Sequence, residues 1–206
     1  TNTSSTIKTI VKKGLATIVF EEVNRYNYDG NSKYKKVELT PKQEEVVDSV
    51  FQSFNKAETF LLYGVTGSGK TEVYMELIER VLNQGKTAIM LVPEISLTPQ
   101  IVGKFISRFG DVISVLHSKL SDTERYDEYR KIIDKKSKIV IGTRSAIFVP
   151  FTNIGIIIID EEHTSSYKQD NNPRYSAKDI AIWRSKYHNC PVLMGSATPS
   201  LESFAR

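Results

Sequence analysis

From residue 39 onward, short apolar segments alternate with amphipathic helical patterns, and this alternation limits the possible folds more than any other feature. Six segments have the length and composition of strands: residues 59–63, 87–92, 112–116, 138–141, 155–160 and 192–195. Helical patterns lie between them, among them residues 71–84, 98–109 and 122–134. Apolar strands joined by helices are typical of a parallel sheet that helices cover on both faces. We therefore predict an α/β domain with a mostly parallel central sheet of about six strands. In such sheets, ligands bind beyond the carboxyl ends of the strands.

The segment Thr40-Pro41-Lys42-Gln43 predicts the start of a helix. Thr40 is a good N-cap and Pro41 suits the first helical position. Gln43 stands three residues after the cap, as a capping box requires. Apolar residues follow at helical spacing as far as Phe54.

Residues 64–71, with the sequence GVTGSGKT, match the pattern G-x-x-x-x-G-K-[ST] between a predicted strand and a predicted helix. Glycines let backbone N–H groups surround phosphate oxygens, and the helix N-terminus adds partial positive charge. We expect Lys70 to reach the β- and γ-phosphates and the Thr71 hydroxyl to bind magnesium. A Gly/Ser-rich turn with a solvated lysine is the alternative, and it leaves the flanking elements unexplained. The predicted ATP-binding residues of this phosphate loop are Gly64, Thr66, Gly67, Ser68, Gly69, Lys70 and Thr71.

The apolar strand before Asp160 and Glu161 predicts where these carboxylates lie. Such a strand delivers Asp160 to the carboxyl edge of the sheet, where it can hold the magnesium ion. Glu161 is then placed to polarise the water that attacks the γ-phosphate. An acidic pair after a strand is commonly a solvated turn, but a phosphate loop in the same sheet favours a catalytic role. The sequence therefore predicts ATP hydrolysis, with ATP and Mg²⁺ as cofactors.

Several further strings resemble the first lobe of superfamily 2 helicases. Asp160-Glu161-Glu162-His163 is similar to their acidic-histidine motif, and Ser196-Ala197-Thr198 to their Ser-Ala-Thr coupling motif. From residue 39 to the last residue, the order and the sequences of these motifs resemble one family, the primosomal replication-restart DNA helicases. The strings are residues 64–74, 91–100, 142–148, 160–169, 174–175 and 195–203.

The resemblance implies a RecA-like P-loop NTPase lobe over residues 38–206. It implies an ATP-dependent 3′-to-5′ DNA helicase that restarts stalled replication forks and loads the primosome. The implied partners are single-stranded and forked DNA, replication-restart and primosome proteins, and single-strand-binding protein. Two alternatives stay open: another superfamily 2 DNA translocase, or a nucleotide-gated module that binds DNA or protein without unwinding.

The resemblance also assigns roles near the nucleotide. It implies that Gln43 contacts the adenine edge, although the capping box by itself explains the position of this residue. It implies that His163 relays the state of the γ-phosphate to Ser196, Ala197 and Thr198. A histidine held by a backbone carbonyl is the alternative for His163.

Residues before and after the acidic motif are implied to contact DNA. The tyrosines among them suit stacking on single-stranded bases, and the cations suit the phosphate backbone. For the residues after the acidic motif, the alternative is a surface loop whose tyrosines pack on the lobe. For Thr143, Arg144 and Ser145, the alternative is a helix cap with a solvated charge. Lys178 departs from the family pattern, which has arginine there, and lysine lacks the bidentate fork. The implied DNA-binding residues are Thr143, Arg144, Ser145, Tyr167, Lys168, Arg174 and Tyr175.

Residues 1–37 have a different pattern of predicted elements from the rest of the sequence. A helix over residues 3–13, a strand over 15–23 and a turn at 29–32 are predicted. The resemblance implies that residues 1–37 are the C-terminal part of a winged-helix domain with a linker. It also leads us to expect that the second helicase lobe and the family's zinc region lie outside this chain, so that the chain alone hydrolyses ATP weakly.

Composition sets looser limits. The net charge of +4 is a mild bias toward polyanions. The single cysteine, Cys190, excludes an internal disulfide and a cysteine-rich zinc site, which favours the cytoplasm. The apolar run at residues 156–159 is far shorter than the ~20 residues of a bilayer span, so we expect no membrane partner. We interpret Cys190 as buried, Trp183 as core, and the charges of residues 122–134 as a solvated helix face.

Overall fold

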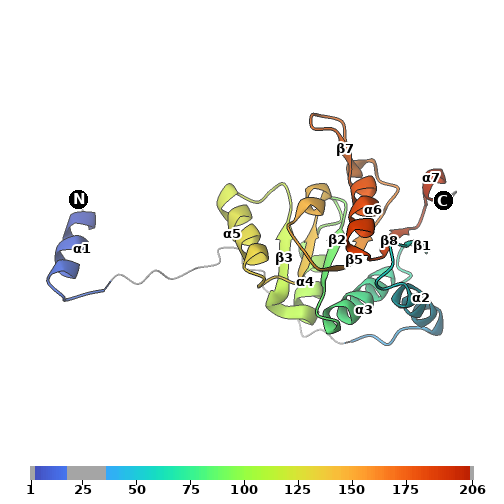
Figure 1. Cartoon of the computed structure of the whole chain (residues 1–206), viewed down its shortest axis with the longest axis horizontal. Helices are drawn as coiled ribbons and strands as arrows, with labels where there is room; N and C mark the ends of the chain where they lie inside the picture. Colours follow the sequence, from blue (N-terminus) through green and yellow to red (C-terminus); the bar gives the residue numbers. More distant parts are fainter. Residues whose placement is uncertain (1–2, 18–35, 205–206) are drawn as a thin grey trace.

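The computed structural model describes residues 3–17 and 36–204 of the chain (Figure 1). Helix α1 (Thr3–Lys12) confirms the helix predicted near the start. The strand predicted at residues 15–23 lies largely outside the described residues, and the turn at 29–32 lies wholly outside them. The assignment of residues 1–37 to a winged-helix domain therefore stays a prediction.

Residues 36–204 form alternating helices and strands close to the predicted positions. The helices are α2 (Pro41–Gln52), α3 (Lys70–Asn83), α4 (Pro99–Phe109), α5 (Asp122–Ile133), α6 (Ala177–His188) and α7 (Leu201–Phe204). The strands are β1 (Thr59–Tyr63), β2 (Thr87–Leu91), β3 (Ile113–Leu116), β4 (Ile139–Gly142), β5 (Ile154–Ile159), β6 (Lys168–Gln169), β7 (Tyr175–Ser176) and β8 (Val192–Ser196). Short 3₁₀ turns are η1 (Gly110–Val112), η2 (Arg144–Phe148) and η3 (Ser165–Tyr167).

The central sheet has six strands in the order β1-β8-β5-β2-β4-β3, and every neighbouring pair is parallel (Figure 1). The predicted parallel α/β sheet is thereby confirmed. Because parallel strands end at the same edge, the segments that follow β1, β5 and β8 leave the sheet side by side. Strands β6 and β7 form a separate antiparallel hairpin that leads directly into α6.

Helices cover both faces of this sheet, and strand β5 shows how the sequence arranges it. Ile156 and Ile158 pack with residues of α2, α3 and α4, whereas Ile157 and Ile159 pack with residues of η2, α5 and α6. All six residues of β5 are buried. Each buried isoleucine contributes about 1.5–3 kcal/mol relative to an exposed one, so a strand that is apolar on both sides favours the centre of the sheet.

The prediction that Trp183 lies in the core is wrong. Trp183 is 65% exposed and stacks on Tyr187, with ring centroids 5.9 Å apart. Helix α6 instead buries its small residues Ala177, Ala181 and Ser185, which recur every fourth position and face the sheet.

The charges of α5 are not all solvated, because Asp127 and Glu128 are buried. The Glu128 carboxylate accepts hydrogen bonds from the Val115 N–H at 3.0 Å and from Lys131 Nζ at 3.0 Å. Cys190 is buried, as predicted. Among the described residues, no helix is both long enough and apolar enough to span a bilayer.

Candidate functional site

The phosphate loop joins β1 to α3 with a backbone that needs glycine. Gly67 and Gly69 have φ values of +80° and +81°, a region that glycine adopts without steric cost. A Cβ on Gly64 would lie 2.7 Å from Ser68 Oγ, so a larger residue there would displace the Ser68 side chain. The side chains of Thr66 and Ser68 at the tip of the loop are exposed. The loop is therefore a bare backbone turn that faces outward.

Helix α3 begins differently from the other long helices of residues 36–204. Helices α2, α4, α5 and α6 begin after a Ser or Thr whose side chain accepts a hydrogen bond from the first turn: Thr40, Thr98, Ser121 and Ser176. The N-cap of α3 is Gly69, and no side chain caps it. The first N–H groups of a helix lack partners within the helix and bind anions readily. The start of α3 therefore fits phosphate oxygens.

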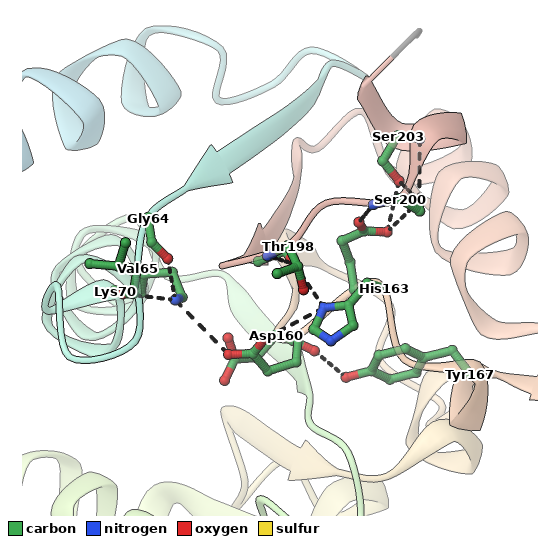
Figure 2. Close-up of polar contacts among 12 residues, drawn as sticks. Gly64, Val65, Lys70, Asp160, His163, Tyr167, Thr198, Ser200 and Ser203 are labelled. Atoms are coloured by element: carbon green, nitrogen blue, oxygen red, sulfur yellow. Dashed lines mark hydrogen bonds and ion pairs between the residues drawn. The ribbon is translucent and has the colours of Figure 1, made fainter.

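Lys70, the first residue of α3, connects the phosphate loop to the acidic turn (residues 160–163). Its ammonium donates to the Gly64 carbonyl at 2.7 Å and to the Val65 carbonyl at 3.4 Å (Figure 2). It also lies 3.9 Å from Glu161 Oε1. The sequence prediction that these two segments meet at one edge of the sheet is confirmed.

Ser196, at the end of β8, contacts both of these segments. Its carbonyl accepts from the Gly64 N–H at 3.1 Å, and its Oγ lies 2.8 Å from His163 Nδ1. Ser196 Oγ also accepts from the Thr198 N–H at 3.1 Å. The structure thus brings the Ser-Ala-Thr segment (residues 196–198) against His163, as the resemblance implied.

Gln43 forms the capping box and also touches the phosphate loop. Its Oε1 accepts from the Thr40 N–H at 2.9 Å, and its Nε2 donates to the Ser68 carbonyl at 3.0 Å. A Cβ on Gly69 would lie 2.4 Å from Gln43 Nε2, which shows how closely α2 approaches the loop. The capping interpretation is confirmed, and the adenine contact stays a prediction.

Asp160 lies at the end of β5 and is held by two tyrosines. Tyr74 of α3 donates to Asp160 Oδ1 at 2.9 Å, and Tyr167 donates to the Asp160 carbonyl at 2.5 Å. Burial raises the pKa of the Asp160 carboxyl, and the Tyr74 hydrogen bond opposes this rise. Carboxylate and hydroxyl oxygens, such as those of Asp160 and Thr71, are the ligands that magnesium prefers. The residues present therefore fit a magnesium–nucleotide group.

Glu161 has an unusual backbone, with φ at +45°. For a residue other than glycine, this conformation costs on the order of 1 kcal/mol and is concentrated at functional sites. It directs the side chain toward Lys70 and His163, since Glu161 Oε2 lies 3.6 Å from His163 Nδ1. Glu161 is therefore aimed at the phosphate loop.

Tyr167 corrects the predicted DNA surface. Its side chain is 1% exposed, and its hydroxyl donates to the Asp160 carbonyl (Figure 2) and to the Leu91 carbonyl. A ring enclosed in this way cannot stack on a nucleic-acid base, so the DNA-stacking prediction for Tyr167 is wrong in this structure. The alternative, a tyrosine packed on the lobe, describes it, and Tyr167 supports β2 and the acidic turn from within.

The other residues of the predicted DNA surface lie together. Arg144 donates to the carbonyls of Ser166 and Lys168, and its guanidinium lies 5.6 Å from the centre of the Tyr175 ring. Arg144 and Tyr175 border a cavity of about 440 Å³ at the carboxyl ends of β2, β3 and β4. Its lining includes Thr143, Arg144, Ser145, Gln169 and Tyr175. Lys168 and Arg174 are exposed on the neighbouring hairpin.

Sequence reasoning missed the roles of Tyr74 and Glu162. Tyr74 looks like an ordinary residue of an amphipathic helix, because its partner Asp160 lies 86 positions away. Glu162 looks like a third solvated acid, yet it is fully buried. Its carboxylate accepts from Lys178 Nζ at 2.8 Å, which also gives Lys178 a partner despite its departure from the family pattern. A useful sequence indication was available, since Glu162 follows an entirely apolar strand.

Comparisons with known proteins agree with this site. The chain is 55% identical to replication restart protein PriA of Bacillus subtilis, with all of this chain and 26% of that protein covered. It is 52% identical to PriA of Haemophilus influenzae over 79% of this chain and 22% of that protein. The chain thus spans about a quarter of the length of the curated relatives it matches.

Solved structures share the fold at low sequence identity. RecG bound to a three-way DNA junction matches with a TM-score of 0.58 and 24% identity, over 82% of this chain and 22% of RecG. The UvsW helicase of bacteriophage T4 matches with a TM-score of 0.57 and 16% identity, over 95% of this chain and 70% of UvsW. The predicted RecA-like α/β lobe is thereby confirmed. The DEAD/DEAH box helicase model matches residues 40–206, which include the phosphate loop, the acidic turn and the Ser-Ala-Thr segment, and the chain belongs to the DEAD/DEAH box helicase family.

Proposed function

We propose that this chain is the ATP-binding lobe of an ATP-dependent DNA helicase that acts in replication restart. One observation carries the proposal: the phosphate loop and the acidic turn meet through the 3.9 Å contact between Lys70 and Glu161. A loop that binds phosphate and a carboxylate that can orient water are the two parts that nucleotide hydrolysis requires. The similarity to PriA supports replication restart as the setting.

Each part of the site has a distinct task in this proposal. The N–H groups at the start of α3 and the Lys70 ammonium bind the β- and γ-phosphates. Thr71 and Asp160 would hold magnesium, which would supply positive charge beside the phosphates. Glu161 orients the attacking water, and Gln43 contacts adenine from its position against Ser68.

The remaining predicted residues connect hydrolysis to DNA. His163 passes the state of the γ-phosphate to the Ser-Ala-Thr segment, through the contact between His163 Nδ1 and Ser196 Oγ at 2.8 Å. The DNA backbone contacts the wall of the cavity formed by Thr143, Arg144 and Ser145. It also contacts Lys168 and Arg174, the cations of the β6–β7 hairpin. Tyr175 offers its ring to a base, because aromatic faces stack on bases without regard to sequence.

The wider setting follows from the PriA resemblance. The substrates are single-stranded and forked DNA, unwound in the 3′-to-5′ direction. The partners are replication-restart and primosome proteins and single-strand-binding protein, and the protein works in the cytoplasm. Full activity requires a second lobe, which supplies the rest of the nucleotide cleft.

The test is the ATPase rate of the full-length protein with and without single-stranded DNA, together with unwinding of a forked duplex. Lys70→Ala lowers the rate by about 100-fold or more under both conditions, because a preorganised charge at the phosphates is lost. Tyr175→Ala leaves the rate without DNA unchanged and lowers the stimulation by DNA. Tyr187→Ala, which alters a tyrosine that is 72% exposed on α6, is the control and leaves both rates unchanged. Full turnover by the Lys70→Ala variant would refute the proposal.

A further inference from the structure

We propose that Glu162 is a positioning residue that holds the acidic turn in a fixed arrangement against the Ser-Ala-Thr segment and α6. The inference rests on the proposed function, because its consequence is a change in the rate of ATP hydrolysis. Glu162 contacts neither the phosphate loop nor the cavity beside Arg144, so it acts through the elements it joins.

The carboxylate of Glu162 is the meeting point of three segments. It accepts from Lys178 Nζ of α6 at 2.8 Å, from the Ser200 N–H at 2.8 Å and from Ser203 Oγ of α7 at 2.7 Å. Ser200 Oγ adds a weaker contact at 3.3 Å. The side chain of Glu162 is 0% exposed, so water cannot replace any of these donors.

The backbone of Glu162 is fixed to the same neighbour. Its N–H donates to the Gly195 carbonyl at 3.0 Å, and the next residue, His163, contacts Ser196. The acidic turn is thus attached to the end of β8 at two successive residues. The Glu162 side chain then attaches it to residues 200 and 203, which lie beyond the Ser-Ala-Thr segment. Both ends of that segment are therefore anchored to one residue of the acidic turn.

Burying a carboxylate costs free energy. Its use to join three segments therefore indicates that the relative positions of these segments are important. The Glu162 carboxylate forms an ion pair with the Lys178 ammonium at 2.8 Å and accepts two further hydrogen bonds from Ser200 N–H and Ser203 Oγ. The group is therefore a charged acceptor with several donors around it. Charged acceptors constrain donor geometry more strongly than apolar contacts do, because each hydrogen bond has a preferred direction.

The position of this cluster explains why the rate should depend on it. Glu161 and Asp160 immediately precede Glu162, and Lys178 lies two residues after β7 of the hairpin. A change at Glu162 therefore shifts Glu161, Asp160 and the Ser-Ala-Thr segment relative to one another. It leaves the phosphate loop, which binds most of the nucleotide, in place. We infer that Glu162 affects kcat rather than the KM for ATP.

The experiment compares variants of the full-length protein by ATPase kinetics and by thermal unfolding. Glu162→Gln keeps an acceptor for the Ser200 N–H but sets an amide against the Lys178 ammonium. Its kcat falls by about tenfold while its KM for ATP stays within about twofold. Lys178→Met gives a similar loss, whereas Lys178→Arg, which keeps the positive charge, restores most of the rate.

Glu128 offers a matched control. It is also a buried glutamate that accepts from a lysine and from a backbone N–H, but it lies on α5 away from the acidic turn. Glu128→Gln lowers the melting temperature and leaves kcat unchanged. Should Glu162→Gln not fold, Ser203→Ala removes a single donor to the carboxylate and lowers kcat by about twofold to threefold.

Two results would overturn the inference. One is a wild-type kcat in Glu162→Gln or, where that variant does not fold, in Ser203→Ala. The other is a loss of kcat in Glu128→Gln as large as the loss in Glu162→Gln at a similar fall in melting temperature. The loss of kcat would then reflect general destabilisation. Neither result touches the proposed function, which stands or falls with the Lys70→Ala variant.

Discussion

The hydroxyl of Tyr74 donates a 2.9 Å hydrogen bond to Asp160 Oδ1 and thereby ties α3 to the end of β5. Tyr74 is fully buried, and burial raises the pKa of its hydroxyl, with the Asp160 charge adding to the effect. The hydroxyl therefore stays protonated and remains a donor. Its hydrogen bond counteracts the burial that raises the pKa of Asp160. The hydrogen bond thus favours the ionised form of the carboxylate, whereas burial favours the neutral form.

Tyr74→Phe should weaken magnesium binding at this carboxylate. A hydrogen bond to a charged group is worth about 1.5 kcal/mol or more, so the magnesium concentration for half-maximal ATPase rises about tenfold. This concentration is measured by titrating MgCl₂ at saturating ATP and recording the ATPase rate. Tyr126→Phe, at a tyrosine that is 64% exposed on α5, serves as the control. An unchanged magnesium dependence in Tyr74→Phe would show that the pair does not prepare Asp160 for the metal.

Gly195→Ala should destabilise the protein through a steric clash with Tyr74. A Cβ at this position would lie 1.7 Å from Tyr74 Oη and 2.9 Å from Tyr74 Cζ. Overpacking of this kind costs about 3 kcal/mol of unfolding free energy, measured by urea denaturation. Gly103→Ala is the matched control, because a Cβ there meets nothing within 4 Å and helix α4 gains stability.

The double variant Gly195→Ala/Tyr74→Phe separates the cause of this loss. It removes the oxygen that the new methyl group meets, so part of the lost stability returns. Strictly additive effects of the two substitutions would mean that the contact with Tyr74 is not what makes glycine necessary.

Arg184 should be important for stability although it has no role at the site. Its guanidinium donates to the carbonyls of Ile147, Val149 and Phe151, and so fastens α6 to the segment between η2 and β5. Arg184→Met removes these three hydrogen bonds and lowers the unfolding free energy by about 2–3 kcal/mol. Lys104→Met, at an exposed position of α4, changes it by less than about 0.5 kcal/mol. Equal effects of the two substitutions would contradict the assignment.

Cys190 should resist thiol reagents while the protein is folded. Burial raises the pKa of its thiol to about 12, and the reactive thiolate is scarce at neutral pH. Labelling with a chromogenic disulfide should proceed only as fast as the protein opens, and at once in denaturant. Rapid labelling of the native protein would contradict this expectation.

The same thiol gives a pH dependence of defined sign. The folded state holds this proton more tightly than the unfolded state, whose thiol has a pKa near 9.0. The thiol therefore contributes stability below about pH 9, and that stability is lost as pH rises toward about 12. Cys190→Ala should decline less steeply over this range in alkaline unfolding experiments, and an equal decline would argue against a buried thiol as the cause.

Local patterns in the sequence were sufficient for the elements and for the phosphate loop. Strand β5 is apolar at every position, which favours the centre of a parallel sheet, and Thr40 with Gln43 satisfies the first turn of α2 by contacts three residues apart. Such effects depend on neighbours in the chain, so the sequence carries them openly. The meeting of Lys70 and Glu161 also followed, because parallel topology brings strand ends together.

The tertiary structure alone decided which side chains are enclosed. Tyr167 was expected to face DNA and is buried, while Trp183 was expected in the core and is exposed. Glu162 became a buried junction only because Lys178, Ser200 and Ser203 surround it. Burial is set by the packing of segments that are distant in the chain, and a residue's type and spacing do not encode its neighbours from elsewhere in the fold. The sequence thus determined the sheet and its loop, whereas the packing of α3, α6 and α7 around the acidic turn determined which residues hold Asp160 and Glu161 in place.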